Sequence, residues 1–280
     1  MLSAAAPAVA EEREALNADP GSERAWAMER LKRRLDGLPA LLGDCRRVRI
    51  CGLPPHGEME GSLRLAGLLS LLAATGFPAR ISESGRPADP AEAVIWLGGA
   101  TEALPPRLDG GAPVLLWPAE AGTAALDRAA GLARPHWLLC QPFQDTPPRA
   151  GLRSIALPDP SHALWGLLDH HPRATEDRVL DLWGERRLRA EPPPPTGGAW
   201  KGAARWVALA GLTKAQADRL RRRLLIERWR RLLVAHTAVA TDSVVCSIFA
   251  ALLGLAVLPR SDAVEAYWHE LAPVILDREG

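Results

Sequence analysis

The sequence lacks the features that would mark a metalloprotein or a nucleic-acid-binding protein. Its four cysteines form no CxxC pair, so we expect no metal site and interpret them as reduced, partly buried thiols. The formal net charge is +1, which provides no overall basic field to attract nucleic acid. We therefore predict neither a metal cofactor nor a nucleic-acid partner.

The sequence also has no clear membrane span or export signal. The longest apolar run, residues 243–258, is shorter than the roughly 20 residues of a spanning helix, and a glycine can divide it into a helix and a strand. The N-terminal stretch MLSAAAPAVAEEREAL has no basic start and turns acidic, which makes it a poor signal peptide. These observations predict a cytoplasmic protein with no transmembrane segment.

The composition is that of an ordinary globular protein, with 48% hydrophobic and 24% charged residues. The 280 residues suffice for one large domain or two modest ones. Ten tryptophans against one tyrosine is unusual, and we interpret it as the codon bias of a GC-rich genome rather than as stacking chemistry.

Residues 43–170 alternate between strand-like apolar runs and helical segments. Strands are expected at RRVRICG, FPARISES, AEAVIWLGG, APVLLWP, HWLLC and LRSIALP, and helices at EGSLRLAGLLSLLAATG, EAGTAALDRAAGLAR and DPSHALWGLLDHH. Continuous apolar strands are typical of a parallel sheet that is covered on both faces. The pattern therefore predicts a Rossmann-like, doubly wound α/β domain.

The segments on either side of this domain have different patterns. Residues 1–42 predict a tail followed by an amphipathic helix from residue 20, whose apolar face contains Trp26, Met28, Leu31, Leu35 and Leu38. Residues 171–205 contain EPPPPTGGAWKG and are expected to form a linker. Residues 206–280 alternate helix (TKAQADRLRRRLLIERWRR), strand (LLVAHTAVA), helix (DSVVCSIFAALLG), strand (LAVLP) and helix (DAVEAYWHELA), which predicts a smaller α/β domain.

The first helix of this smaller domain is rich in arginine. Its arginines could bind phosphate or a nucleic-acid backbone, but Asp218 and Glu227 interrupt them, so a solvated helix face is favoured. A scaffold protein that uses this helix and the N-terminal helix is an alternative of a different class. The apolar residues that recur at helical spacing are Leu220, Leu224, Trp229 and Leu232.

The turn after the first expected strand raises a question of chemistry. A strand, a glycine turn and a helix often hold an anionic ligand in α/β proteins, and PHGEMEGSLRLAGLL follows the strand VRICGL. Glu58 and Glu60, however, stand where a phosphate site needs bare backbone amides, and their charge would repel an anion. We predict that the geometry of the turn persists without its anion chemistry.

Several polar residues fall at expected strand ends, which face the cleft in open α/β sheets. The candidate catalytic residues are His56, His236 and Asp242, and the candidate substrate-binding residues are Gly57, Gly98, Gly99, His162 and Arg260. Each has a purely structural alternative. The histidines can be core or surface residues, Asp242 and Asp159 can cap helices, and the paired glycines can form a tight turn.

Five motifs follow one another along the chain: HGEMEG, IWLGGA, LLWPAE, LPDPSHALWG and TDSVVCSIFAALLG. Their order resembles that of the polysaccharide pyruvyl transferase family over about residues 46–270. In that family the corresponding motifs are H-G-N-x-G-D, G-G-G-N, L-P-Q-S, P-D-M-A-x-x-L-G and T-D-R-L-H-x-H-I-L-A-L-L-L-G. His56, Gly57 and Gly67 agree with the first motif, and Thr241 and Asp242 with the last.

This resemblance implies two Rossmann-like lobes arranged as in GT-B glycosyltransferases, with a shortened second lobe. It implies the transfer of a pyruvyl group from phosphoenolpyruvate to a sugar during exopolysaccharide or cell-surface glycan biosynthesis. No cofactor is implied beyond this donor. The implied partners are a sugar or glycan acceptor and other polysaccharide-biosynthesis enzymes.

The sequence departs from the family at positions whose charged side chains would contact phosphoenolpyruvate. The family's arginine and two histidines in the last motif fall on Ser243, Val245 and Ser247, whereas residues that shape turns and pack the core persist. Two alternatives follow from this pattern. The chain is either an atypical transferase or a non-catalytic relative that binds a sugar, a nucleotide-sugar or a partner glycosyltransferase.

Overall fold

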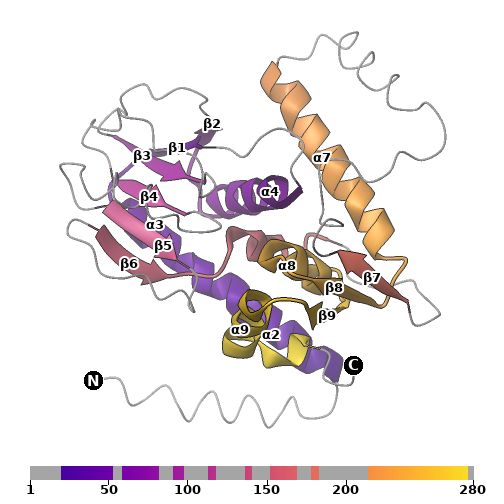
Figure 1. Ribbon diagram of the computed structural model, residues 1–280. Coiled ribbons are helices and arrows are strands. Elements are labelled where there is room, and N and C mark those ends of the chain that lie inside the picture. The colour runs from indigo at the N-terminus through magenta and orange to yellow at the C-terminus, as the bar shows by residue number, and fades with distance from the viewer. Residues whose placement is uncertain are drawn as a thin grey trace, which may run out of the picture.

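The computed structural model describes residues 20–52, 59–81, 91–97, 113–117, 136–140, 152–168, 178–182 and 214–276. These residues form an α/β protein with two parallel sheets, one of six strands and one of three (Figure 1). The predicted α/β class with parallel strands is therefore confirmed. Within the described residues, no helix has the length and apolar character needed to cross a membrane.

The larger sheet is built from the apolar runs of residues 43–170. Its strands are β1 (Arg47–Cys51), β2 (Ala79–Ile81), β3 (Glu92–Trp96), β4 (Val114–Leu116), β5 (His136–Cys140) and β6 (Leu152–Ala156), in the spatial order β2-β1-β3-β4-β5-β6. β3 and β4 are buried along their whole length. β4 is apolar throughout, as its sequence predicts, whereas β3 begins with the buried Glu92, which pairs with Arg49 and Arg80. The direction of strand addition reverses between β1 and β3, and open α/β sheets bind ligands beside such a point.

Helix α4 (Met59–Ala74) joins the two halves of the structure. Leu68 and Leu72 pack in the core of the larger sheet, whereas Met59 and Leu63 pack in the core of the smaller one. Gly76 follows two residues after the last residue of the helix and terminates it, as the sequence predicts, with a φ of 77° that only glycine adopts readily. Because one helix serves both cores, the two sheets are coupled through it.

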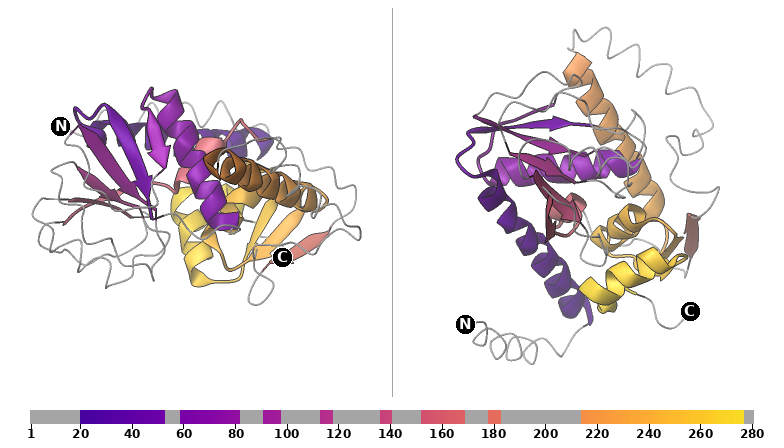
Figure 2. Two further views of the ribbon diagram at one scale, coloured as in Figure 1. Left: turned by 90° about the horizontal axis from the view of Figure 1, so that it is seen from above. Right: turned by 60° about the vertical axis from the view of Figure 1, so that its left-hand side comes forward.

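The expected N-terminal helix is divided into α2 (Pro20–Arg34), a 3₁₀ turn η1 (Leu35–Gly37) and α3 (Leu38–Leu42). Figure 2 shows α2 running from the larger sheet to helix α9 (Asp262–Leu271). Met28 and Leu31 pack in the core of the smaller sheet, and Leu35 and Leu38 in that of the larger sheet. The predicted apolar face is buried, except that Trp26 is half-buried.

The smaller sheet has the parallel order β7-β8-β9, formed by β7 (Val179–Leu182), β8 (Ala238–Thr241) and β9 (Ala256–Pro259). Helix α8 (Val244–Leu252) connects β8 to β9, and α9 is followed by the 3₁₀ turn η4 (Pro273–Ile275). β7 lies inside the segment 171–205 that was expected to be a linker. It is an edge strand with one buried residue, Leu182, so its apolar pattern is weak.

Helix α7 (Lys214–Leu233) packs against α4 with a face that only partly matches the predicted apolar stripe, since Trp229 is buried as expected. Its buried residues are Arg222, Leu225, Trp229 and Leu233. Leu220 and Leu224 are 38% and 40% exposed, so the predicted apolar stripe is wrong for these two. The helix carries two lines of leucines, and the sequence alone does not indicate which one is buried. The strand expected at LLVAHTAVA begins only at Ala238, because its first two leucines complete α7.

Candidate functional site

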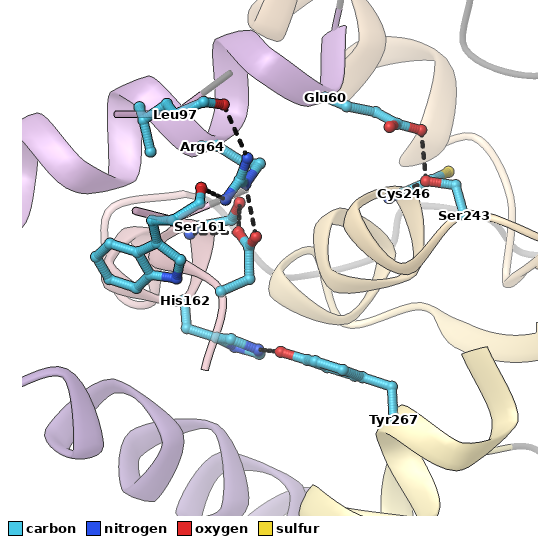
Figure 3. Close-up of polar contacts among 10 residues, drawn as sticks. Glu60, Arg64, Leu97, Ser161, His162, Ser243, Cys246 and Tyr267 are labelled. Carbon is cyan, nitrogen blue, oxygen red and sulfur yellow. Dashed lines mark hydrogen bonds and ion pairs between the residues drawn. The ribbon is translucent and has the colours of Figure 1, made fainter. Parts of the chain in front are cut away.

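Three segments meet at the carboxyl edge of the larger sheet. They are the first half of α4, the beginning of α8, and the 3₁₀ turn η2 (Pro160–Leu164), which leads from β6 toward β7 (Figure 3). The sequence predicted a longer helix at η2, but the structure has one 3₁₀ turn that ends before Gly166, whose φ is 79°. Ligands of parallel α/β sheets bind at this kind of edge.

The beginnings of α4 and α8 are linked by a carboxylate. Ser243 is the N-cap of α8: its Oγ accepts a hydrogen bond from Cys246 N at 3.2 Å and donates one to Glu60 Oε1 at 2.5 Å. Glu60 lies in the first turn of α4. Each helix has partial positive charge at its N-terminus, so the Glu60 carboxylate lies where both helices favour an anion.

The alternative that Asp242 caps α8 is wrong, because Ser243 holds that position. The main-chain carbonyl of Asp242 accepts a hydrogen bond from Ser261 Oγ at 3.1 Å. Ser261 is in turn the N-cap of α9 and accepts from Val264 N at 3.3 Å. The loop that carries Asp242 therefore fixes the start of two successive helices.

A buried ion pair connects α4 to η2. Arg64 Nε donates to Asp159 Oδ2 at 2.8 Å, and the two side chains are 4% and 0% exposed. Arg64 Nη2 and Nη1 donate to the carbonyls of Trp117 at 2.6 Å and Leu97 at 3.4 Å, which directly follow β4 and β3 (Figure 3). This arginine thus fixes two strand ends and η2 together. Sequence analysis missed it, although an arginine within the apolar helix sequence LRLAGLL was a usable signal.

The other oxygen of Asp159 caps η2, as the sequence predicted for this residue. Asp159 Oδ1 accepts from Ser161 N at 2.9 Å and from Ser161 Oγ at 2.5 Å. Gly67 permits the close contact between α4 and η2, because a Cβ there would lie 2.1 Å from the Pro160 carbonyl oxygen. The glycine and aspartate that match the family pattern therefore have structural roles here.

His162 belongs to the buried core rather than to an open pocket. Its ring is 0% exposed, its Nε2 lies 2.6 Å from Tyr267 Oη, and Trp268 meets it edge-on. Burial lowers the pKa of His162 to about 4, although the charge of Asp159 opposes this shift. The imidazole is therefore neutral at neutral pH and offers no charge to an acidic substrate.

His236 and Asp242 are not brought together. His236 precedes β8 and its Nδ1 lies 3.0 Å from the Leu232 carbonyl oxygen, whereas Asp242 follows the strand. The four residues of β8 lie between them, so they stand at opposite ends of the strand. Arg260 is exposed after β9, and its backbone N–H donates to Thr241 O at 2.8 Å, so Arg260 and Asp242 share the carboxyl edge of the smaller sheet.

The remaining candidates, His56, Gly57, Gly98 and Gly99, lie outside the described residues. Within the described part of the chain, no group of three or more His, Cys, Asp or Glu side chains is placed to hold a metal ion. Burial raises the pKa of Cys51 to about 11 and that of Cys246 to about 12. Both thiols are therefore protonated and unreactive at neutral pH.

The chain matches no known protein family and no curated protein sequence. It is similar in structure to a functionally uncharacterised protein from Klebsiella pneumoniae, known from a crystal structure, with a TM-score of 0.52 and 14% sequence identity. The similarity covers 86% of this chain and 93% of that one. At this level of identity the comparison establishes a shared fold alone, so function must be argued from the residues of the site.

Proposed function

We propose that this chain is a polysaccharide pyruvyl transferase-like protein whose donor site does not bind phosphoenolpyruvate. It would then serve cell-surface glycan biosynthesis by binding a ligand rather than by pyruvyl transfer. A GT-B-like arrangement of two Rossmann-like lobes is part of this proposal. The observation that carries it is the Glu60 carboxylate hydrogen-bonded to the N-cap of α8. A phosphoenolpyruvate donor needs this region for its own negative charges.

Glu60 opposes a bound donor through its charge. Two unit charges 4 Å apart repel by about 4 kcal/mol near a protein surface, which corresponds to roughly a thousandfold loss of affinity. The nearby Arg64 does not compensate, because Asp159 and two strand-end carbonyls already accept its hydrogen bonds. His162 is neutral and buried. A carboxylate therefore lies at the two helix N-termini that the donor would need for its own charges.

The positions that carry the family's arginine and histidines support the same proposal. Ser243 is a helix cap and Val245 is buried in the core. Ser247 Oγ donates to Val244 O and accepts from Trp268 Nε1, each at 2.7 Å. Forming a ketal requires an acid for the enol carbon and a base for the sugar hydroxyl. None of these three side chains supplies either group at neutral pH.

The same carboxylate disfavours the diphosphate of a nucleotide-sugar. A neutral sugar of the glycan, or a partner glycosyltransferase, is therefore the favoured ligand. A thermal-shift series with phosphoenolpyruvate, UDP-glucose and a neutral oligosaccharide tests this, because a ligand that binds the folded state raises Tm. We expect no shift with millimolar phosphoenolpyruvate or UDP-glucose. A saturable shift with phosphoenolpyruvate overturns the proposal.

An active transferase is the second candidate, and one observation favours it. Arg260 and Asp242 share the carboxyl edge of the smaller sheet, where a cation and a carboxylate could contact donor and acceptor. This alternative predicts micromolar phosphoenolpyruvate binding that Arg260→Ala abolishes. Arg46→Ala, which changes an exposed arginine just before β1, is the matched control and should leave that binding unchanged.

A further inference from the structure

The side of α7 that faces away from α4 combines exposed leucines with arginines. We call it the α7 outer face and define it by Leu220, Leu224, Arg219, Arg221, Arg223, Arg228 and Arg231. Glu227 lies on the same face, where it pairs with Arg230 and Arg231. The two leucines are 38% and 40% exposed and lie four residues apart, one turn along the helix. Arg221 and Arg228 flank them on one side and Arg219 and Arg223 on the other, as the helical repeat of 100° per residue dictates.

The helix cannot rotate to bury these leucines. Its opposite face is held in the core by Leu225, Trp229 and Leu233, which are 8%, 4% and 0% exposed. On the same side, Arg222 Nη1 donates to Ser62 Oγ of α4 at 3.4 Å. Figures 1 and 2 show α7 crossing beside one end of α4, with its first turns extending beyond that helix. The exposed leucines are therefore a fixed property of this surface.

The charge of α7 differs from that of the rest of the chain. The helix has eight basic and two acidic residues, a net charge of +6, whereas the whole chain has a net charge of +1. Glu227 is held by Arg230 and Arg231 at 2.8 and 2.9 Å. Hydrogen bonding from Arg230 is the main reason that the pKa of Glu227 falls to about 2, so it remains ionised and paired. The flanking arginines thus surround the leucines with positive charge.

We propose that the α7 outer face docks an acidic amphipathic helix of a partner protein. Leucine-like side chains four residues apart on that helix would pack against Leu220 and Leu224, and flanking glutamates or aspartates would face the arginines. Two leucines four residues apart on one helix can pack against apolar side chains of the same spacing on a second helix. Charge complementarity selects an acidic partner and orients it on this surface.

Other occupants fit this surface less well. A second copy that paired α7 with α7 would place arginines against arginines. An anionic membrane takes up the apolar face of an amphipathic helix, and that face of α7 is already buried in the core. A nucleic-acid backbone needs an uninterrupted basic track, whereas two leucines occupy the middle of this one.

Fluorescence anisotropy on the full chain tests the proposal. The probe is a labelled helical peptide with two leucines four residues apart, flanked by glutamates, and its control is a scrambled peptide of the same composition. We expect saturable binding of the probe, and at least tenfold weaker binding of the scrambled peptide. The combined variant Leu220→Ser and Leu224→Ser should weaken binding about tenfold or more. Leu167→Ser, which changes a leucine that is 62% exposed elsewhere, should leave binding unchanged.

The charge contribution is tested separately with Arg219→Glu combined with Arg223→Glu. This variant should also bind at least tenfold more weakly, and the wild-type affinity should fall as salt rises. Arg46→Glu, an exposed arginine outside α7, is the charge control. Circular dichroism verifies that each variant is folded. Failure of the probe to bind overturns the proposal, as does binding that survives loss of both leucines. Tighter binding of phosphatidylserine vesicles or duplex DNA to the same face also overturns it.

Discussion

The guanidinium of Arg64 and the carboxylate of Asp159 form a buried ion pair of 2.8 Å where α4 meets η2. The pair lies just beyond the strand ends at which α/β proteins bind ligands, and Arg64 also donates to the carbonyls that follow β3 and β4. A cation in this location would suit an anionic substrate. Here its hydrogen bonds hold the protein together instead.

We predict that Arg64→Met greatly destabilises the fold. The substitution leaves the Asp159 carboxylate buried without its cation, which typically costs about 3–5 kcal/mol. Urea denaturation followed by circular dichroism measures the loss. Arg33→Met is the matched control, because its pair with Glu29 is exposed and contributes about 1 kcal/mol or less. Equal effects of the two substitutions would contradict the structural role of Arg64.

The second prediction concerns Ser243. Ser243→Ala removes the cap of α8 and should cost about 0.5–2 kcal/mol. Ser243→Asp keeps a capping oxygen but places a second carboxylate against Glu60, so it should destabilise more than alanine does. Adding Glu60→Gln to Ser243→Asp should then recover stability in a double-mutant cycle. If Ser243→Asp is as stable as wild type, the Glu60 carboxylate is not at this cap.

The third prediction uses the close approach of α4 and η2. Gly67→Ala would place a Cβ 2.1 Å from the Pro160 carbonyl oxygen, so η2 must move and stability should fall by about 1–3 kcal/mol. Gly37→Ala is the control, because a Cβ there meets nothing within 4 Å. The control should be neutral or slightly stabilising. The denaturation midpoints of both variants measure the difference, and a neutral Gly67→Ala would argue against this packing.

The fourth prediction is a pH dependence of stability that arises from His162. Burial lowers the pKa of His162 from 6.5 to about 4, so the unfolded chain binds a proton between these values that the folded chain does not. The free energy of unfolding should therefore decrease as pH falls from 6.5 toward 4, by on the order of 3 kcal/mol. His162→Gln should flatten this decline, whereas His269→Gln, at an exposed site, should leave it unchanged.

Much of the fold was predictable because the strands of parallel sheets have simple local signatures. β4 and most of β3 are apolar, β1 alternates two arginines with apolar residues, and the alternation of α8, β9 and α9 follows from helical and extended patterns in adjacent segments. β7 was hidden because it is a short edge strand beside a proline-rich stretch. Leu220 and Leu224 of α7 were wrongly expected to be buried, because the two lines of leucines on this helix are equivalent until α4 packs against one of them.

The candidate site was less predictable because its contacts join distant segments. Arg64 and Asp159 are 95 residues apart in the sequence, and Glu60 and Ser243 are 183 apart. The sequence correctly indicated that Asp159 caps its turn, because an N-cap is a local interaction. It did not indicate that Glu60 meets α8, because this contact depends on how the two sheets are placed.

Isothermal titration calorimetry with phosphoenolpyruvate, on the wild-type chain and on Glu60→Gln, tests the central claim most directly. We predict no saturable heat for the wild-type chain at millimolar donor, and weak binding at most after the carboxylate is removed. Saturable binding of phosphoenolpyruvate to the wild-type chain at micromolar concentration, lost in Arg260→Ala, would contradict the proposed loss of donor binding.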